Sequence, residues 1–126
     1  MPFTQDTAQK ILAKILKNTD FTHPTAWHVS LHTADPGNTG ASECTGGSYA
    51  RQSATFGTIS GKAVSNSGAL EFTGMPACTV THVGIWSLAS GGAFWWGGAA
   101  TASKTLTAGD TYRIPVGDLT ATLDPA

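Results

Sequence analysis

TVTHVGIWSLASGGAFWWGG, residues 79–98, is the stretch that decides the fold. Its first ten residues are rich in β-branched and aromatic side chains, and the apolar residues fall on both parities of the strand alternation. That pattern predicts a central strand over residues 79–88 that is covered on both faces. The small and glycine residues at 89–92 are typical of a turn, and residues 93–97 resume the strand pattern. The stretch therefore predicts a β-hairpin.

Further strand patterns lie on both sides of this hairpin. Trp27, Val29 and Leu31 alternate with polar residues, which predicts a half-buried strand. Turn-forming segments, such as a hairpin turn at 57–62, separate the other expected strands, at 49–56, 69–73, 104–107 and 111–123. The apolar phase of the last strand flips at Gly117, which indicates a bulge or a kink, and Pro115 favours an edge or a bend there.

These patterns together predict a mostly-β fold. About seven or eight short strands separated by turn signals are typical of an antiparallel β-sandwich or a jelly-roll-like architecture. A length of 126 residues suits one ordinary domain. We therefore expect a single domain over residues 1–126, with one N-terminal amphipathic helix at 4–18 and the β-sandwich at 26–123.

The N-terminal segment carries a helical period. Thr4 is a suitable N-cap, and Asp6 in the first turn and Lys17 in the last turn suit the helix dipole. Apolar residues follow at i, i+3, i+4, i+7 and i+8, which places Ala8, Ile11, Leu12, Ile15 and Leu16 on one stripe. The stripe must be buried against the sandwich or against a neighbouring subunit.

Composition and charge restrict the classes of function. Charged residues make up 12% of the chain and the formal net charge is −1, whereas a nucleic-acid binder is clearly basic. The chain shows no apolar core behind basic residues at its start, so no secretory signal is expected. No run approaches the roughly 20 apolar residues of a membrane span, so we expect no membrane partner.

The residue spacings that catalytic and metal-binding motifs require do not occur in the sequence. His28 and His32 would share a face of a helix, but on a strand they lie about 13 Å apart, too far for one metal ion. We expect no metal site even though His23 and His82 are also available. No serine lies in a GxSxG motif, and the glycines form no phosphate loop. Asp110 and Asp118 are better explained as turn residues than as a glycosidase pair. We expect no enzyme activity, no catalytic residue, no metal and no cofactor.

The two cysteines leave an alternative open. Cys44 and Cys78 lie in no CxxC motif and in no metal-ligand spacing. Two free thiols suit a protein made in a reducing cytosol, and a disulfide formed after release into an oxidising medium is the alternative.

Two regions are candidate binding surfaces. Adjacent strand positions point to opposite faces, so Trp95 and Trp96 are expected to place one ring on each face, and the exposed ring could stack on a sugar or contact a protein. The segment 34–48 has no periodicity and many turn formers, which predicts a long exposed loop that carries contacts. Its candidate contact residues are Asp35, Asn38 and Glu43.

Several segments, in this order, carry a family resemblance. They are GGSYARQ at 46–52, VTHVGI at 80–85 and LTATL at 119–123, with matching patterns at 27–36, 66–72 and 108–111. The chain resembles small phage and prophage proteins described as tail-fibre-like, over nearly its whole length. It departs from their pattern at Trp95 and Trp96, where those proteins more often carry smaller apolar residues.

The resemblance implies a structural protein of a tailed-phage virion, made in the bacterial cytoplasm. It would be a tail-fibre-like protein or a capsid decoration or cement protein. The expected partners are other virion proteins and further copies of the chain, as a trimer or dimer, with no nucleic acid. The alternative function is a carbohydrate-binding module that contacts a host-surface glycan through Trp95 or Trp96.

Overall fold

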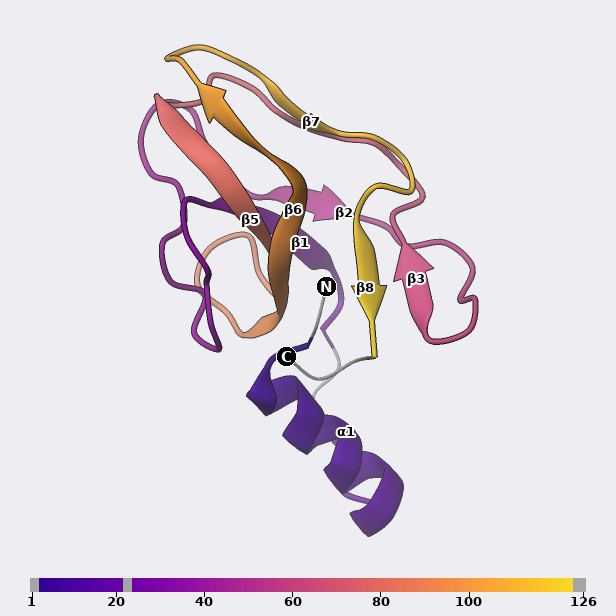
Figure 1. The fold of residues 1–126 in the computed structure, drawn as a ribbon. Coiled ribbons are helices and arrows are strands. Elements are labelled where there is room, and N and C mark those ends of the chain that lie inside the picture. The colour runs from indigo at the N-terminus through magenta and orange to yellow at the C-terminus, as the bar shows by residue number, and fades with distance from the viewer. Residues whose placement is uncertain (1–2, 22–23, 124–126) are drawn as a thin grey trace.

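The computed structural model describes residues 3–21 and 24–123 and is mostly β, with antiparallel pairing and one N-terminal helix (Figure 1). This confirms the predicted fold class. In chain order the elements are α1 Gln5–Lys17, β1 Trp27–His32, β2 Gln52–Ala54, β3 Ala63–Ser65, β4 Leu70–Phe72, β5 Cys78–Trp86, β6 Phe94–Leu106, β7 Tyr112–Ile114 and β8 Thr120–Thr122.

The strands form one larger sheet and two ribbons. The four-stranded sheet has the order β2-β1-β5-β6, so β5 is a central strand and forms a hairpin with β6, as residues 79–98 predict. The ribbons pair β3 with β8 and β4 with β7. All of these pairings are antiparallel.

The main core lies between the sheet and the ribbons, in a sandwich-like arrangement. Val29, Leu31 and Val83 of the sheet are at most 4% exposed and belong to the same apolar cluster as Phe72 and Ile114 of the β4–β7 ribbon. Burial of these alternating side chains provides the main drive for the two layers to pack together.

The other face of the sheet is also covered, so the prediction of a half-buried strand at 27–32 is wrong. Ser30 and His32 on that face are fully buried. The His32 ring bonds to the hydroxyl of Ser30 at 2.6 Å and to the carbonyl of Ala41 at 2.7 Å, and the Trp86 indole N–H donates to the Ser30 hydroxyl at 2.8 Å. Polar residues are tolerated in this layer because their hydrogen bonds are made internally.

The ends of several strands differ from the prediction. β6 is continuous where two separate strands were expected, and the expected strand at 111–123 is divided into β7 and β8. Gly117 has a φ of +82°, and the Asp118 N–H donates to the Pro115 carbonyl, so the predicted kink is a full turn. β3 was not predicted, because three residues beside a polar turn carry too little pattern.

Candidate assembly surface

Helix α1 forms where its capping signals predict. The Thr4 side chain accepts a hydrogen bond from the Thr7 N–H, Asp6 lies in the first turn, and Asn18 ends the helix in the left-handed conformation. Lys10 forms an ion pair with Asp6 one turn away. The bounds agree with the prediction to within one residue at each end.

The first turn of α1 is fixed to the edge of the sheet. The Thr4 N–H donates to the Trp95 carbonyl at 2.8 Å, and its hydroxyl donates to the Phe94 carbonyl at 3.0 Å. The Thr7 hydroxyl donates to the Trp95 carbonyl at 2.8 Å. From these bonds to β6 the helix runs away from the body of the protein (Figure 1).

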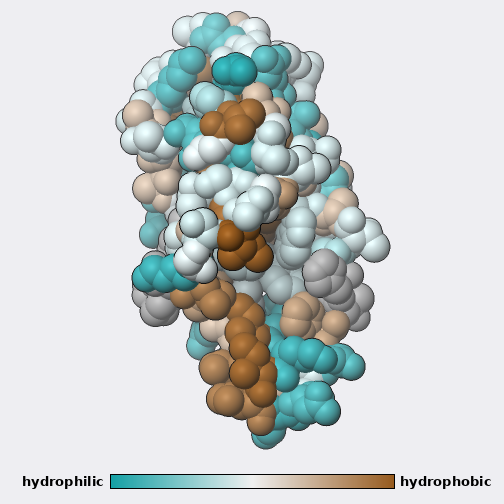
Figure 2. All heavy atoms as spheres, turned by 90° about the vertical axis from the view of Figure 1, so that its right-hand side faces the viewer, coloured by the Kyte–Doolittle hydropathy of each residue, from teal (hydrophilic) through white to brown (hydrophobic). Residues whose placement is uncertain are grey.

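The end of the helix beyond these bonds exposes its apolar side chains. Leu12, Ile15 and Leu16 are 56%, 72% and 75% exposed, and we call them the helix stripe. Figure 2 shows hydrophobic side chains running along α1 toward the body above it. The predicted apolar stripe, expected to be buried on the sandwich or on a neighbouring subunit, is half-buried within the chain at Ala8 and Ile11 and exposed at these three residues.

A β-bulge brings the two adjacent tryptophans together. Ile85 pairs with Trp96 and Trp86 pairs with Phe94, so Trp95 is an extra residue in β6. The Trp95 and Trp96 rings lie 6.3 Å apart at 18°, and both contact the Trp27 ring, at 5.2 and 6.2 Å. The prediction of one ring on each face is wrong, because it assumed regular alternation.

Neither tryptophan is a freely exposed platform. Trp95 is 5% exposed, and the Lys10 ammonium lies 4.6 Å from the centre of its ring. The Trp96 indole N–H donates to the Thr122 carbonyl at 3.1 Å. Trp95 thus supports the base of α1, and Trp96 links the sheet to the β3–β8 ribbon.

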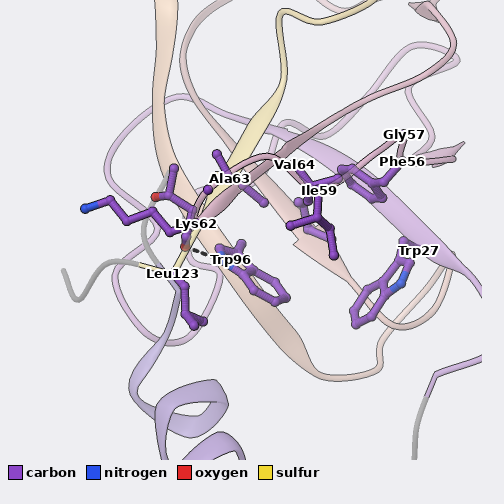
Figure 3. A pocket seen from close by; sticks show the side chains of 13 residues that line it. Trp27, Phe56, Gly57, Ile59, Lys62, Ala63, Val64, Trp96 and Leu123 are labelled. Carbon is purple, nitrogen blue, oxygen red and sulfur yellow. Dashed lines mark hydrogen bonds between the residues drawn. The ribbon is translucent and has the colours of Figure 1, made fainter.

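An open apolar groove of about 430 Å³ lies between the sheet and that ribbon. Figure 3 shows Trp27 and Trp96 along one side of it, Ile59 and Phe56 along the other, and Leu123 at the end nearer α1. Ile59 and Leu123 are 74% and 52% exposed. We call this hollow the apolar groove. Its lining residues are Trp27, Phe56, Gly57, Ile59, Gly61, Lys62, Ala63, Val64, Ile85, Trp96, Ala121, Thr122 and Leu123.

The three predicted loop contacts do not form one site. The side-chain amide oxygen of Asn38 accepts from the Gln5 N–H at 3.0 Å, and the Asp35 carboxylate accepts from the Gly37 N–H at 2.9 Å. Asp35 and Asn38 both line a hollow beside Thr4 at the start of α1. The Glu43 side chain is instead 21% exposed and paired with Arg51. The segment 34–48 is not uniformly exposed, because Pro36, Gly40 and Cys44 in it are buried.

The two residues considered as a catalytic pair, Asp110 and Asp118, instead make hydrogen bonds that stabilise a turn and a strand. The Asp110 carboxylate accepts from the backbone and hydroxyl of Thr107, which lowers the pKa of Asp110, and Asp118 accepts from the Thr101 hydroxyl at 3.2 Å.

Of the four histidines considered as metal ligands, His23 lies outside the described residues. Over 3–21 and 24–123, no group of three or more His, Cys, Asp or Glu side chains is placed to hold a metal ion. No helix in those same ranges is long and apolar enough to cross a membrane.

A comparison with protein families settles the relationship. The family described as podophage GP4 fiber I protein gp80 matches residues 2–122. The chain belongs to this family. Its membership confirms the resemblance to tail-fibre-like phage proteins and makes the chain a phage structural protein. None of the curated proteins compared with the chain matches it.

Sequence reasoning found the helix stripe but missed the apolar groove of this fibre-family protein. The groove requires the β3–β8 ribbon and the bulge at Trp95, and both depend on pairing between distant segments. One signal in the sequence was Ile59, a large apolar residue inside a segment that otherwise reads as a polar turn.

Proposed function

We propose that this chain is a component of the tail-fibre apparatus of a phage virion and that it works through protein–protein contacts, without catalysis. The proposal assigns it contacts with other virion proteins and with further copies of itself. The observation that carries it is the helix stripe, a set of apolar side chains on a helix that leaves the body of the protein. Apolar patches of this kind on small proteins mark interaction surfaces.

Family membership supports the fibre over a capsid decoration, since the matching family is described as a fiber protein. The buried state of Trp95 and the bonded indole of Trp96 give less support to glycan binding than to protein contacts. We therefore advance no second function.

A mass-spectrometric inventory of purified virions tests the proposal. We expect the chain in the particle, at a copy number that is a low multiple of the rotational symmetry of the tail. A copy number comparable to that of the major capsid protein would contradict the fibre assignment and favour a capsid decoration. Complete absence from the particle would contradict the structural role.

Virions that carry Ile15→Glu are expected to contain at least about tenfold less of the protein. Ile15 is 72% exposed, so a carboxylate there leaves the fold intact but places a charge in the proposed contact. Quantitative mass spectrometry of particles, with Val116→Glu as the matched control, checks this. Val116 is 61% exposed and lies outside both the helix stripe and the apolar groove. Normal incorporation of the Ile15 variant would show that the helix stripe is not needed for assembly.

A further inference from the structure

The helix stripe and the apolar groove are two exposed apolar surfaces of the same chain that do not meet each other. No residue of α1 lines the groove. The hydrogen bonds from Thr4 and Thr7 to β6 fix the start of α1, and the helix then runs away from the body (Figure 1). Each surface therefore stays open to water within one copy.

We propose that the helix stripe of one copy docks into the apolar groove of a second copy. This inference rests on the proposed function, since it names the self-contact through which the fibre component would assemble. The contact joins two different surfaces. Two copies can make it reciprocally as a pair, or each copy can offer its helix to one neighbour and its groove to another in a ring or an open filament.

The two surfaces are compatible in spacing and size. Leu12, Ile15 and Leu16 occupy positions i, i+3 and i+4, which is the spacing by which an amphipathic helix enters an apolar groove. The groove, of about 430 Å³, has the size of sites that enclose apolar ligands. Its walls come from both layers of the fold, since Trp27 and Trp96 face Ile59 across it (Figure 3).

The charges around the two surfaces allow this contact. Lys14 on α1 forms an ion pair with Asp20, so this charge beside the stripe is already balanced within its own chain. Among the described residues that line the groove, Lys62 is the one with a charged side chain. Over the described residues, docking therefore buries mainly apolar side chains.

The area favours a second copy over an unrelated partner. The helix stripe presents apolar surface on the order of 300 Å², which alone is small for a stable contact. In a reciprocal pair both stripes and both grooves are buried, which brings the total area buried by the two copies together toward the roughly 1,200 Å² at the lower end of stable interfaces. Self-association thus covers both apolar surfaces of every copy in a pair or ring, whereas two different partners would otherwise be needed.

Light scattering and analytical ultracentrifugation of the purified full chain test the docking. We expect the wild type to self-associate and both Ile15→Glu and Ile59→Glu to weaken that association at least about 30-fold. Both side chains are more than 70% exposed, so each variant is expected to keep the thermal stability of the wild type. Val116→Glu is the control and is expected to associate normally.

A mixture of the two defective variants distinguishes the docking from other contacts. Ile59→Glu retains a normal helix and Ile15→Glu retains a normal groove, so the mixture is expected to form dimers although each variant alone is monomeric. A helix-to-helix contact predicts loss with Ile15→Glu only and no rescue by mixing. That result, a monomeric wild type, or occupation of the groove by the chain's own helix would overturn the inference. Virions that contain the chain while the mixture stays monomeric would overturn the docking but not the proposed function.

Discussion

Replacing Arg51 with alanine is expected to lower the free energy of unfolding by about 3 kcal/mol, since it leaves a mostly buried carboxylate without its cation. The Arg51 guanidinium donates two hydrogen bonds of 2.9 Å to the Glu43 carboxylate. The Arg51 and Glu43 side chains are 8% and 21% exposed. Urea denaturation followed by tryptophan fluorescence measures the loss.

Arg51 does more than form an ion pair. It donates to the carbonyls of Leu88 and Gly91 at 3.0 and 2.8 Å, which fixes the turn of the β5–β6 hairpin. Its guanidinium carbon lies 3.8 Å from the centre of the Trp86 ring. Arg51→Lys keeps the charge but loses the forked geometry, and we expect it to retain about half of the stability that Arg51→Ala loses.

A second arginine provides the matched control. Arg113 and Glu71 lie on the paired strands β7 and β4, 3.5 Å apart, and both side chains are more than half exposed. An exposed pair contributes below about 1 kcal/mol, so Arg113→Ala is expected to have a small effect. Equal losses in the two alanine variants would contradict the special role of Arg51.

The pH dependence gives an independent check on the same ion pair. Burial raises the pKa of Glu43, but hydrogen bonds from Arg51 and Tyr49 and the charge of Arg51 outweigh it, so the pKa falls below 4.5. The carboxylate therefore contributes stability above its unfolded pKa of 4.5, and this contribution is lost as the pH falls through the lower folded value. We expect Glu43→Gln to flatten the decline in stability below pH 4.5.

Local patterns in the sequence predict local structure well here. The caps at Thr4 and Asn18 and the apolar period of α1 depend on residues close in sequence, and so does the hairpin around 89–92. Each of these elements was placed to within a few residues, because its own side chains and backbone geometry select it.

Structural features that depend on contacts between distant segments could not be predicted from local sequence patterns. The extra residue at Trp95 follows from how β6 pairs with β5, and the burial of Ser30 and His32 follows from the loop that covers them. The local pattern predicts an exposed contact residue at Glu43 because it does not show the partner, Arg51, which lies on the far side of a turn. In each case the deciding contact joins two segments that are distant in sequence, and the local pattern of neither segment indicates that contact.

Oxidation is expected to join Cys44 to Cys78 and to raise the free energy of unfolding by about 3 kcal/mol. The two sulfur atoms lie 3.4 Å apart and both thiols are free in the structure. The cysteines are 34 positions apart, so the bond would close a long loop and restrict the unfolded chain. The melting temperature should rise by roughly 10 °C.

The order of the chemical steps follows from the exposure of the two thiols. Burial, together with the hydrogen bond to Cys78, raises the pKa of Cys44 to about 12, whereas Cys78 is partly exposed. Glutathione disulfide is therefore expected to react first at Cys78, forming a mixed disulfide and releasing one glutathione. Cys44 then attacks the Cys78 sulfur, forms the protein disulfide and releases the second glutathione.

Intact-mass spectrometry of the folded protein after incubation with glutathione disulfide checks this, because the bond removes two hydrogen atoms. Cys44→Ser is the matched control and should stop at the mixed disulfide, with no rise in melting temperature. Dithiothreitol should return the wild type to its reduced mass and stability. A folded protein that keeps both thiols under oxidant would contradict the prediction. Since the reaction needs an oxidant, the bond and the gain in stability are expected in an oxidising medium and not in a reducing one.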